Sequence, residues 1–130
     1  METTPRTAVA QAIDAEVAGH TSLGRWLDTV DAHPDLLALR DRWREITFAR
    51  LADQVARTAA GMRALGVGPG DRVVLMMRNS PEFHVVDLAA LCCGATPISI
   101  YTSSAPEQVA YLVGHSKAKL AVVEDPSFAE

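Results

Sequence analysis

The chain has 130 residues, of which 48% are hydrophobic and 22% are charged. That length suffices to bury a core, and the balance is typical of a globular domain rather than a disordered segment. The formal net charge is −4. Because nucleic-acid-binding proteins usually carry a basic face, the composition argues against DNA or RNA as a partner.

The cysteines and the apolar runs bear on the compartment. Cys92 and Cys93 are the only cysteines and are adjacent, which fits neither a zinc site nor a disulfide framework and favours a reducing environment. The first twenty residues lack the apolar core of a signal peptide, and no apolar run approaches the roughly 18–20 residues that span a membrane. We therefore predict a cytoplasmic chain with no integral membrane segment, and leave peripheral membrane contact open.

The first third of the chain predicts a helix and a hairpin after a flexible N-terminus. Residues 1–20 are polar and weakly patterned, as mobile termini often are. Thr21 is a candidate N-cap for a short helix that Pro34 ends. Two short segments, Leu36–Arg40 and Trp43–Thr47, are then spaced for a hairpin. The apolar face of the short helix repeats at i, i+3, i+4 and i+7: Leu23, Trp26, Leu27 and Val30.

The clearest helix begins after Thr47 and ends before Gly66, which is predicted to take the left-handed conformation of a C-cap. The turn at 68–71 then leads into Val73–Met77, an apolar run without alternation. Such a run predicts a strand that is covered on both faces, as in a parallel sheet. The apolar stripe of the helix is continuous: Phe48, Leu51, Ala52, Val55, Ala56, Ala59, Met62 and Leu65.

A second helix and strand follow. Ser80 as N-cap and Pro81 at the first helical position predict a helix that Gly94 ends. That helix is apolar nearly all round, so we expect several of its sides to be buried. Pro97–Tyr101 is the predicted second strand.

The last helix and strand complete the pattern. Ser104 and Glu107 have the spacing of a capping box, which predicts a helix that stops near Gly114. Lys119–Val123 is the third predicted strand. Strand, helix, strand, helix, strand is a βαβαβ unit, so we predict an α/β fold with a layered, mostly parallel sheet. It is preceded by a helix, the hairpin and the long amphipathic helix, and forms a partial domain.

The glycines at 66, 68 and 70 superficially suggest a dinucleotide-binding loop. That motif needs two residues between its second and third glycines, and it runs from a strand into a helix N-terminus. Here the chain runs from a helix into a strand, so we interpret the segment as a structural turn. The segment Thr102–Ser104 has the right topology for a phosphate loop but contains neither glycine nor lysine.

Other polar and aromatic residues have structural interpretations. His84 and Asp87 are placed to pair on one helix, but no nucleophile or metal ligand lies nearby in sequence, so we interpret them as a polar edge facing a neighbouring layer. His115 is a favourable charge at a helix C-terminus. The two cysteines are interpreted as small buried hydrophobic residues. We also interpret Trp26 and Trp43 as packing residues, and predict no catalytic, cofactor-binding or metal-binding residue in the chain.

Six blocks of sequence, in this order and spacing, resemble the N-terminal part of the AMP-forming acyl-CoA synthetases, which belong to the adenylate-forming superfamily. The resemblance covers about Leu23 to Asp125. The segment Ile98–Ser104 is most similar to the long-chain fatty-acid branch. The blocks are Trp43–Leu51, Leu65–Val73, Asn79–Phe83, Gly94–Tyr101, Thr102–Tyr111 and His115–Lys119.

The resemblance implies a reaction that this chain does not complete. Family members activate a carboxylate with ATP and Mg²⁺ to an acyl-adenylate, release pyrophosphate, and pass the acyl group to coenzyme A. Their phosphate loop with its lysine, adenine-binding segment, ribose-binding aspartate and C-terminal lysine lie downstream of Glu130. We therefore expect residues 21–130 to be the N-terminal part of a truncated AMP-binding domain that is inactive alone.

The same resemblance sets the expected ligands and partners. ATP, CoA and Mg²⁺ belong to the full-length enzyme, and we expect none of them to bind this fragment tightly. The expected partners are a fatty acid and the missing C-terminal portion of the ligase. Self-association through apolar surface on the helix 81–93 is also expected. Two alternatives stay open: a self-contained α/β binding module, and a fragment of an aryl-acid or amino-acid adenylating enzyme.

Overall fold

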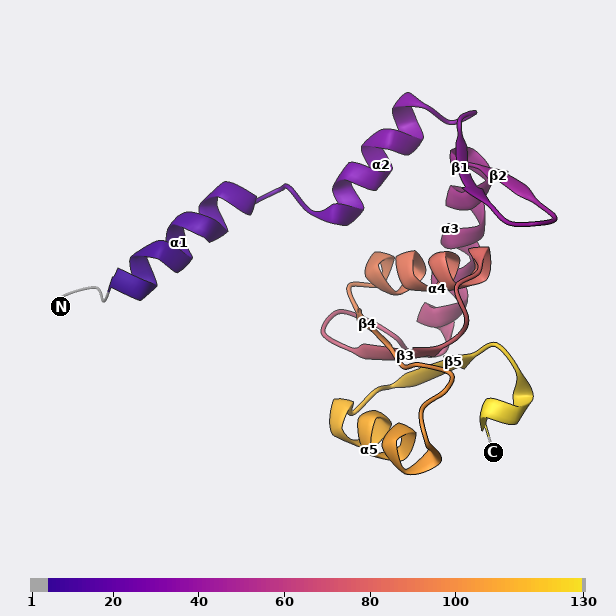
Figure 1. Cartoon of the computed structure of the whole chain (residues 1–130). Helices are drawn as coiled ribbons and strands as arrows, with labels where there is room; N and C mark the ends of the chain where they lie inside the picture. Colours follow the sequence, from indigo (N-terminus) through magenta and orange to yellow (C-terminus); the bar gives the residue numbers. More distant parts are fainter. Residues whose placement is uncertain (1–4, 130) are drawn as a thin grey trace.

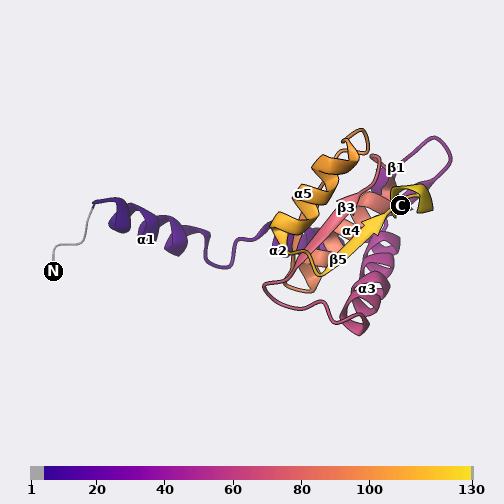
Figure 2. The same ribbon diagram turned by 90° about the horizontal axis from the view of Figure 1, so that it is seen from below.

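The computed structural model describes residues 5–129, and its centre is a three-stranded parallel sheet between helices (Figures 1 and 2). The strands are β3 (Arg72–Met76), β4 (Thr96–Ser99) and β5 (Leu120–Val123), in the order β4-β3-β5. One face is covered by α4 (Pro81–Cys92), against which α3 (Phe48–Ala64) packs, and the other by α5 (Pro106–Ser116). The predicted α/β unit with a parallel sheet is confirmed.

The central strand β3 is buried on both faces, as its unbroken apolar run predicts. Val73 and Leu75 are fully buried in the main core under α4, while Val74 and Met76 are buried outside that cluster, which places them on the α5 face. Val74 pairs with Ile98 of β4 on one side and with Ala121 of β5 on the other. Every position of the strand interior is therefore packed.

The main core lies between α3, α4 and one face of the sheet. Four members of the predicted stripe supply its α3 side chains, but Ala56 and Leu65 of that stripe are exposed, so the stripe is confirmed in part. The buried members are Ile46, Leu51, Val55, Ala59, Met62, Val67, Val73, Leu75, Val85, Val86, Ala89, Ala90, Cys93 and Ala95. On the opposite face, α5 contains no buried residue, so the second layer is the weaker one.

The N-caps predicted for the first three helices of the sequence analysis are confirmed. Thr21 Oγ1 accepts from Gly24 N at 3.0 Å and starts α2 (Ser22–Ala32). Thr47 Oγ1 accepts from Arg50 N at 3.3 Å and starts α3. Ser80 Oγ accepts from Phe83 N at 3.3 Å and starts α4. Each bond satisfies one of the free N–H groups of a first helical turn.

The cap of α5 is a correction. Ser104 is not its N-cap and Glu107 takes no part, because the helix begins at Pro106 and the cap is therefore Ala105. A residue before proline is disfavoured in helical conformation, and Ala105 is extended, with ψ 148°. The side chain of Gln108 reaches back instead and accepts from Ala105 N at 3.2 Å. The helix also continues beyond Gly114 and ends at Lys117, with φ 51°.

Before α3, the predicted hairpin is confirmed as antiparallel β1 (Leu37–Arg40) and β2 (Glu45–Thr47). The chain also has a helix that the sequence reasoning missed, α1 (Pro5–Val17), which lies apart from the sheet and its helices in both views (Figures 1 and 2). Alanine-rich sequence favours a helix by backbone propensity even without an apolar stripe. A short 3₁₀ helix, Pro126–Ala129, follows β5.

Because β3 lies in the core, shortening one of its buried side chains should destabilise the fold. We predict that Leu75→Ala lowers the free energy of unfolding by about 2–5 kcal/mol, because Leu75 is completely buried and its loss leaves a cavity. Urea unfolding followed by circular dichroism measures the change. Leu112→Ala on the exposed side of α5 is the control, and an equal loss in both variants would contradict a core centred on β3.

Two glycines with positive φ allow backbone strain to be separated from crowding. Gly94 has φ 73°, and a Cβ there would lie 3.2–3.3 Å from the backbone and ring of Pro69. Gly70 has φ 80° but open space around it. Both alanine variants should lose about 1–2 kcal/mol of stability from the left-handed backbone. We predict a larger loss for Gly94→Ala than for Gly70→Ala in parallel urea titrations; the reverse order would contradict the packing of the 66–71 turn on Gly94.

Candidate functional site

The main candidate site is a hollow of about 550 Å³ at the carboxyl ends of β3 and β4. In open α/β sheets, ligands bind outside the carboxyl ends of the parallel strands. The hollow combines an apolar wall with several polar side chains. Its lining residues are Met77, Arg78, Asn79, Phe83, Ser99, Ile100, Tyr101 and Thr102.

Local structure explains how the wall is assembled. Ile100 N donates to Leu75 O at 2.8 Å, which extends the pairing of β4 with β3 by one residue and buries Ile100. The Ser80 cap fixes the first turn of α4 and with it Phe83, which is partly buried against the main core. Tyr101 comes directly after Ile100 in the chain and is 85% exposed. The hollow therefore has a packed floor and a free aromatic ring at its rim.

An ion pair spans the neighbouring carboxyl ends of β3 and β5. Arg78 Nε donates to Glu124 Oε1 at 2.7 Å, and Arg78 N donates to Glu124 Oε2 at 2.6 Å. These hydrogen bonds lower the pKa of the Glu124 carboxyl. Because α4 and α5 cross on opposite faces, this is the switch point where doubly wound sheets open a crevice. In this chain the Arg78–Glu124 ion pair lies at that switch point.

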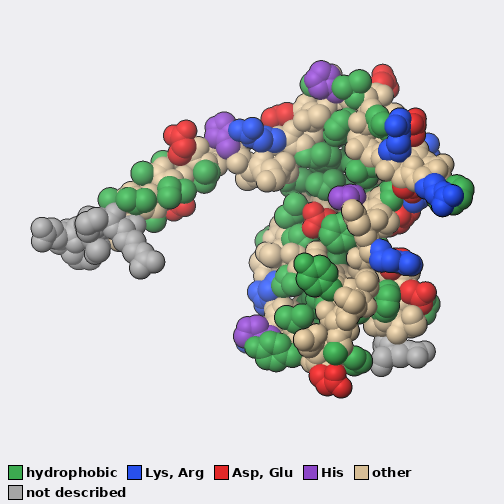
Figure 3. Space-filling model, viewed as in Figure 1, with side chains coloured by type: hydrophobic (Ala, Val, Ile, Leu, Met, Phe, Trp, Pro, Cys, Tyr) green, Lys and Arg blue, Asp and Glu red, His purple; other side chains and the backbone are tan. Residues whose placement is uncertain are grey.

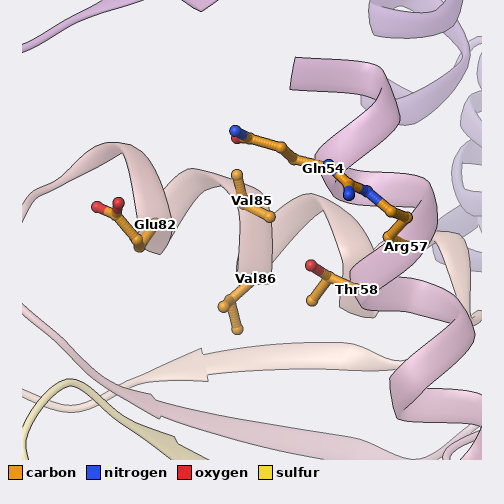
Figure 4. Close-up of a pocket in the computed structure, with 6 residues that line it drawn as sticks. All are labelled: Gln54, Arg57, Thr58, Glu82, Val85 and Val86. Carbon is orange, nitrogen blue, oxygen red and sulfur yellow. The ribbon is translucent and has the colours of Figure 1, made fainter. Parts of the chain in front are cut away.

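A second hollow, of about 480 Å³, lies between α3 and α4 (Figure 4). Gln54, Arg57 and Thr58 come from α3 and face Glu82, Val85 and Val86 of α4. Its charged groups are already paired: Arg57 with Asp53 at 2.7 Å, and Glu82 with Arg44, whose Nη2 donates to Oε2 at 3.2 Å. Neither hollow brings together a nucleophile and a base.

The family resemblance implies a magnesium ion and a triphosphate, which need carboxylate oxygens and cationic side chains respectively. Magnesium prefers carboxylate oxygens, and none lines the hollow at the carboxyl ends. The one guanidinium there, that of Arg78, is bound to Glu124. No cluster of three or more His, Cys, Asp or Glu side chains within residues 5–129 could hold a metal ion. The hollow at the carboxyl ends of β3 and β4 therefore offers no unpaired cation to a triphosphate and no carboxylate to a magnesium ion.

Comparison with known proteins identifies the family. The family model described as AMP-binding enzyme matches residues 26–130. The chain belongs to the AMP-binding enzyme family. It is 40% identical over 93 residues to uncharacterized protein Rv1549 of Mycobacterium tuberculosis, a match that covers 70% of this chain and 53% of that protein. The chain thus spans about half the length of this relative, and much less of the relatives that are named as enzymes.

Two of those enzymes differ in the acid named for them. The long-chain-fatty-acid–CoA ligase FadD15 of Mycobacterium bovis is 37% identical over 87 residues, which is 67% of this chain and 14% of the ligase. The 3-hydroxybenzoate–CoA ligase of an Aromatoleum strain is 37% identical over 86 residues, 66% of this chain and 16% of the ligase. The names of these relatives therefore do not agree on one acid, and family membership does not select one for this chain.

Solved structures agree on the fold. The fatty acyl CoA synthetase of M. tuberculosis aligns with a TM-score of 0.74 at 30% identity, over 78% of this chain and 21% of that chain. The N-terminal subdomain of NpsA from Klebsiella oxytoca aligns with a TM-score of 0.75 at 24% identity, over 80% of this chain and 26% of that one. The described unit thus has the fold of a part of these two proteins.

The two histidines considered in the sequence, His84 and His115, each contact an aromatic ring. His84 packs edge-on against Phe83, with ring centroids 5.5 Å apart, and no hydrogen bond or ion pair joins it to Asp87 within residues 5–129. Burial raises the pKa of Asp87, against a smaller lowering by His84. His115 stacks on Tyr111, with centroids 5.4 Å apart.

The cysteine and tryptophan interpretations are confirmed for Cys93 and Trp26 and only in part for Cys92. Cys93 is buried, and its Sγ lies 3.5 Å from Ala59 O, while Cys92 is half-buried and burial raises the pKa of its thiol. Trp26 packs against the main core. The interpretation of Trp43 as a packing residue is wrong: it lies beyond the end of β1 at the hairpin turn and is 79% exposed.

The half-buried Asp87 carboxyl should make the stability of the fold depend on pH. Its raised pKa stabilises the folded chain only below the ordinary aspartate value of about 3.9, and that contribution is lost as pH rises through the folded pKa. We predict that Asp87→Asn raises the free energy of unfolding at neutral pH but not in acid. Glu124→Gln is the opposite-sign control, because the lowered pKa of Glu124 gives stability that is lost in acid. Urea titrations across pH measure both, and a pH-independent effect of Asp87→Asn would contradict the assignment.

Proposed function

We propose that this chain is the N-terminal part of a long-chain fatty-acid–CoA ligase. Such an enzyme uses ATP and Mg²⁺ to convert a fatty acid to an acyl-adenylate and then forms a thioester with CoA. The observation that carries the proposal is that sequence and fold agree over the same βαβαβ unit. The relative named for long-chain fatty acids is 37% identical, and a solved fatty acyl CoA synthetase is 30% identical with a TM-score of 0.74.

In this proposal, residues 21–130 frame one side of a larger AMP-binding domain, and the segment before them, which contains α1, is separate from that domain. The hollow at the carboxyl ends of β3 and β4 is one wall of the substrate site. The remainder of the enzyme supplies the groups that hold phosphate and metal. The 130 residues alone bind ATP, CoA and Mg²⁺ weakly and do not turn over.

The location that fits this proposal is the cytoplasm, with peripheral contact at a membrane. Within the described part of the chain, no helix is long and apolar enough to cross a membrane. A fatty acid is an amphiphile that partitions into bilayers, so a ligase benefits from reaching its substrate at the lipid surface.

A second candidate is a ligase for an aryl acid, favoured by the equal identity to the 3-hydroxybenzoate enzyme. ATP–pyrophosphate exchange across carboxylates separates the two. For a ligase that contains this segment, we predict exchange that depends on long-chain fatty acids and weakens when Tyr101→Ala removes the exposed ring of the hollow. For the 130-residue chain alone we predict no exchange.

Three results of the exchange assay would contradict parts of this proposal. Exchange that depends on 3-hydroxybenzoate rather than on fatty acids overturns the acyl substrate. Exchange by the isolated chain overturns its inactivity. Full activity of the Tyr101→Ala ligase shows that the hollow is no part of the site; Tyr111→Ala on the exposed side of α5 is the matched control.

A further inference from the structure

The tip of the hairpin, residues 40–45, carries an aromatic side chain that nothing in the fold uses. Trp43 is 79% exposed, and the guanidinium of Arg42 lies over its ring, 5.0 Å from the centroid. The hairpin projects from one end of the layered body, beyond α3 (Figure 1). An indole that is exposed to water does not gain the free energy of burial, which a large aromatic side chain gains only when a binding partner covers it.

Charge is distributed unevenly about this tip. Residues 40–57 contain five arginines and three acidic residues, a net charge of +2, whereas the whole chain carries −4. The remaining residues therefore carry −6. Figure 3 shows several blue side chains at the hairpin end of the molecule. The arginines are Arg40, Arg42, Arg44, Arg50 and Arg57, and the acidic residues are Asp41, Glu45 and Asp53.

Two of these five cations are not neutralised by an acid. Arg40 pairs with Glu45 at 2.6 Å, Arg57 pairs with Asp53, and Arg44 pairs with both Asp41 and Glu82. Within residues 5–129, no ion pair involves Arg42 or Arg50. Arg42 lies over the exposed indole, and Arg50 lines the same hollow as Trp43, together with Arg44 and Glu45.

The turn holds this arrangement in a fixed conformation. Asp41 Oδ1 accepts from Trp43 N at 2.7 Å and from Arg44 N at 2.6 Å. Arg44 then reaches Glu82 at the first turn of α4, which ties the hairpin to the layered body. The ring is thus presented by a braced turn, and little conformational freedom is lost when it docks.

We propose that the hairpin tip docks on an anionic phospholipid surface, with Trp43 at the headgroup level and Arg42 and Arg50 on lipid phosphates. Tryptophan concentrates at membrane interfaces, and guanidinium groups bind phosphates through paired hydrogen bonds. The acidic remainder of the chain is repelled by the same surface, so the charge asymmetry orients the tip toward the lipid. Two free cations are few for a nucleic acid, whose binding needs an extended basic face.

Vesicle binding by the 130-residue chain tests this proposal without relying on the acid that the ligase activates. In a Trp26→Phe chain, Trp43 is the only tryptophan, and its emission should shift to the blue when phosphatidylglycerol-containing vesicles are added. Vesicles of phosphatidylcholine alone should give little shift. Co-sedimentation with the same vesicles should fall as salt is raised, because the attraction is screened.

Matched variants locate the contact. Arg42→Glu changes the local charge by two and should weaken binding roughly tenfold or more, and Trp43→Ala should also weaken it. Lys117→Glu makes the same charge change on the far side of the sheet and should bind nearly as the parent does. Circular dichroism confirms that each variant is folded.

Several outcomes overturn the proposal. They are no binding to anionic vesicles, equal binding to both vesicle types, and binding that Lys117→Glu weakens as much as Arg42→Glu does. A Trp43 emission that shifts only when another protein is added would assign the tip to a protein partner instead. None of these results bears on whether the ligase activates fatty acids.

Discussion

The structure depends on burying β3 on both of its faces. An unbroken apolar strand cannot leave one face in water, so it requires a layer on each side and a neighbour at each edge. Val73 and Leu75 meet the α3–α4 layer, and Val74 and Met76 lie on the α5 face. The chain therefore returns to β3 twice through right-handed crossovers, once on each side.

This central strand also positions the surfaces that bear on function. Strands β3 and β4 end side by side, and the residues after them form the hollow that includes Phe83 and Tyr101. On the β5 side, the Arg78–Glu124 pair occupies the crevice instead. In the same first turn of α4, Glu82 binds Arg44 of the hairpin, so the tip is braced against the same framework.

The described unit is small beside the relatives that are named as enzymes. The chain covers only 14% of the fatty-acid ligase FadD15 and 21% of the solved fatty acyl CoA synthetase. In our proposal, the segment contributes a framework and one wall of the site, while reactive groups come from elsewhere in the enzyme. The hollow's lining of apolar side chains, amides and hydroxyls, without a base beside a nucleophile, is consistent with such a role.

The sequence by itself determined the elements that local chemistry controls. The caps at Thr21, Thr47 and Ser80, the helix ends at Gly66 and Gly94, and the doubly buried strand follow from side-chain hydrogen bonds, backbone conformation and periodicity. The start of α5 was misread only because a capping-box spacing was given more weight than Pro106. The tertiary structure alone decided the strand order, the exposure of Trp43, and the pairs Arg44–Glu82 and Arg78–Glu124. Those pairs join residues 38 and 46 positions apart, and such contacts depend on how whole layers pack, which no local pattern encodes.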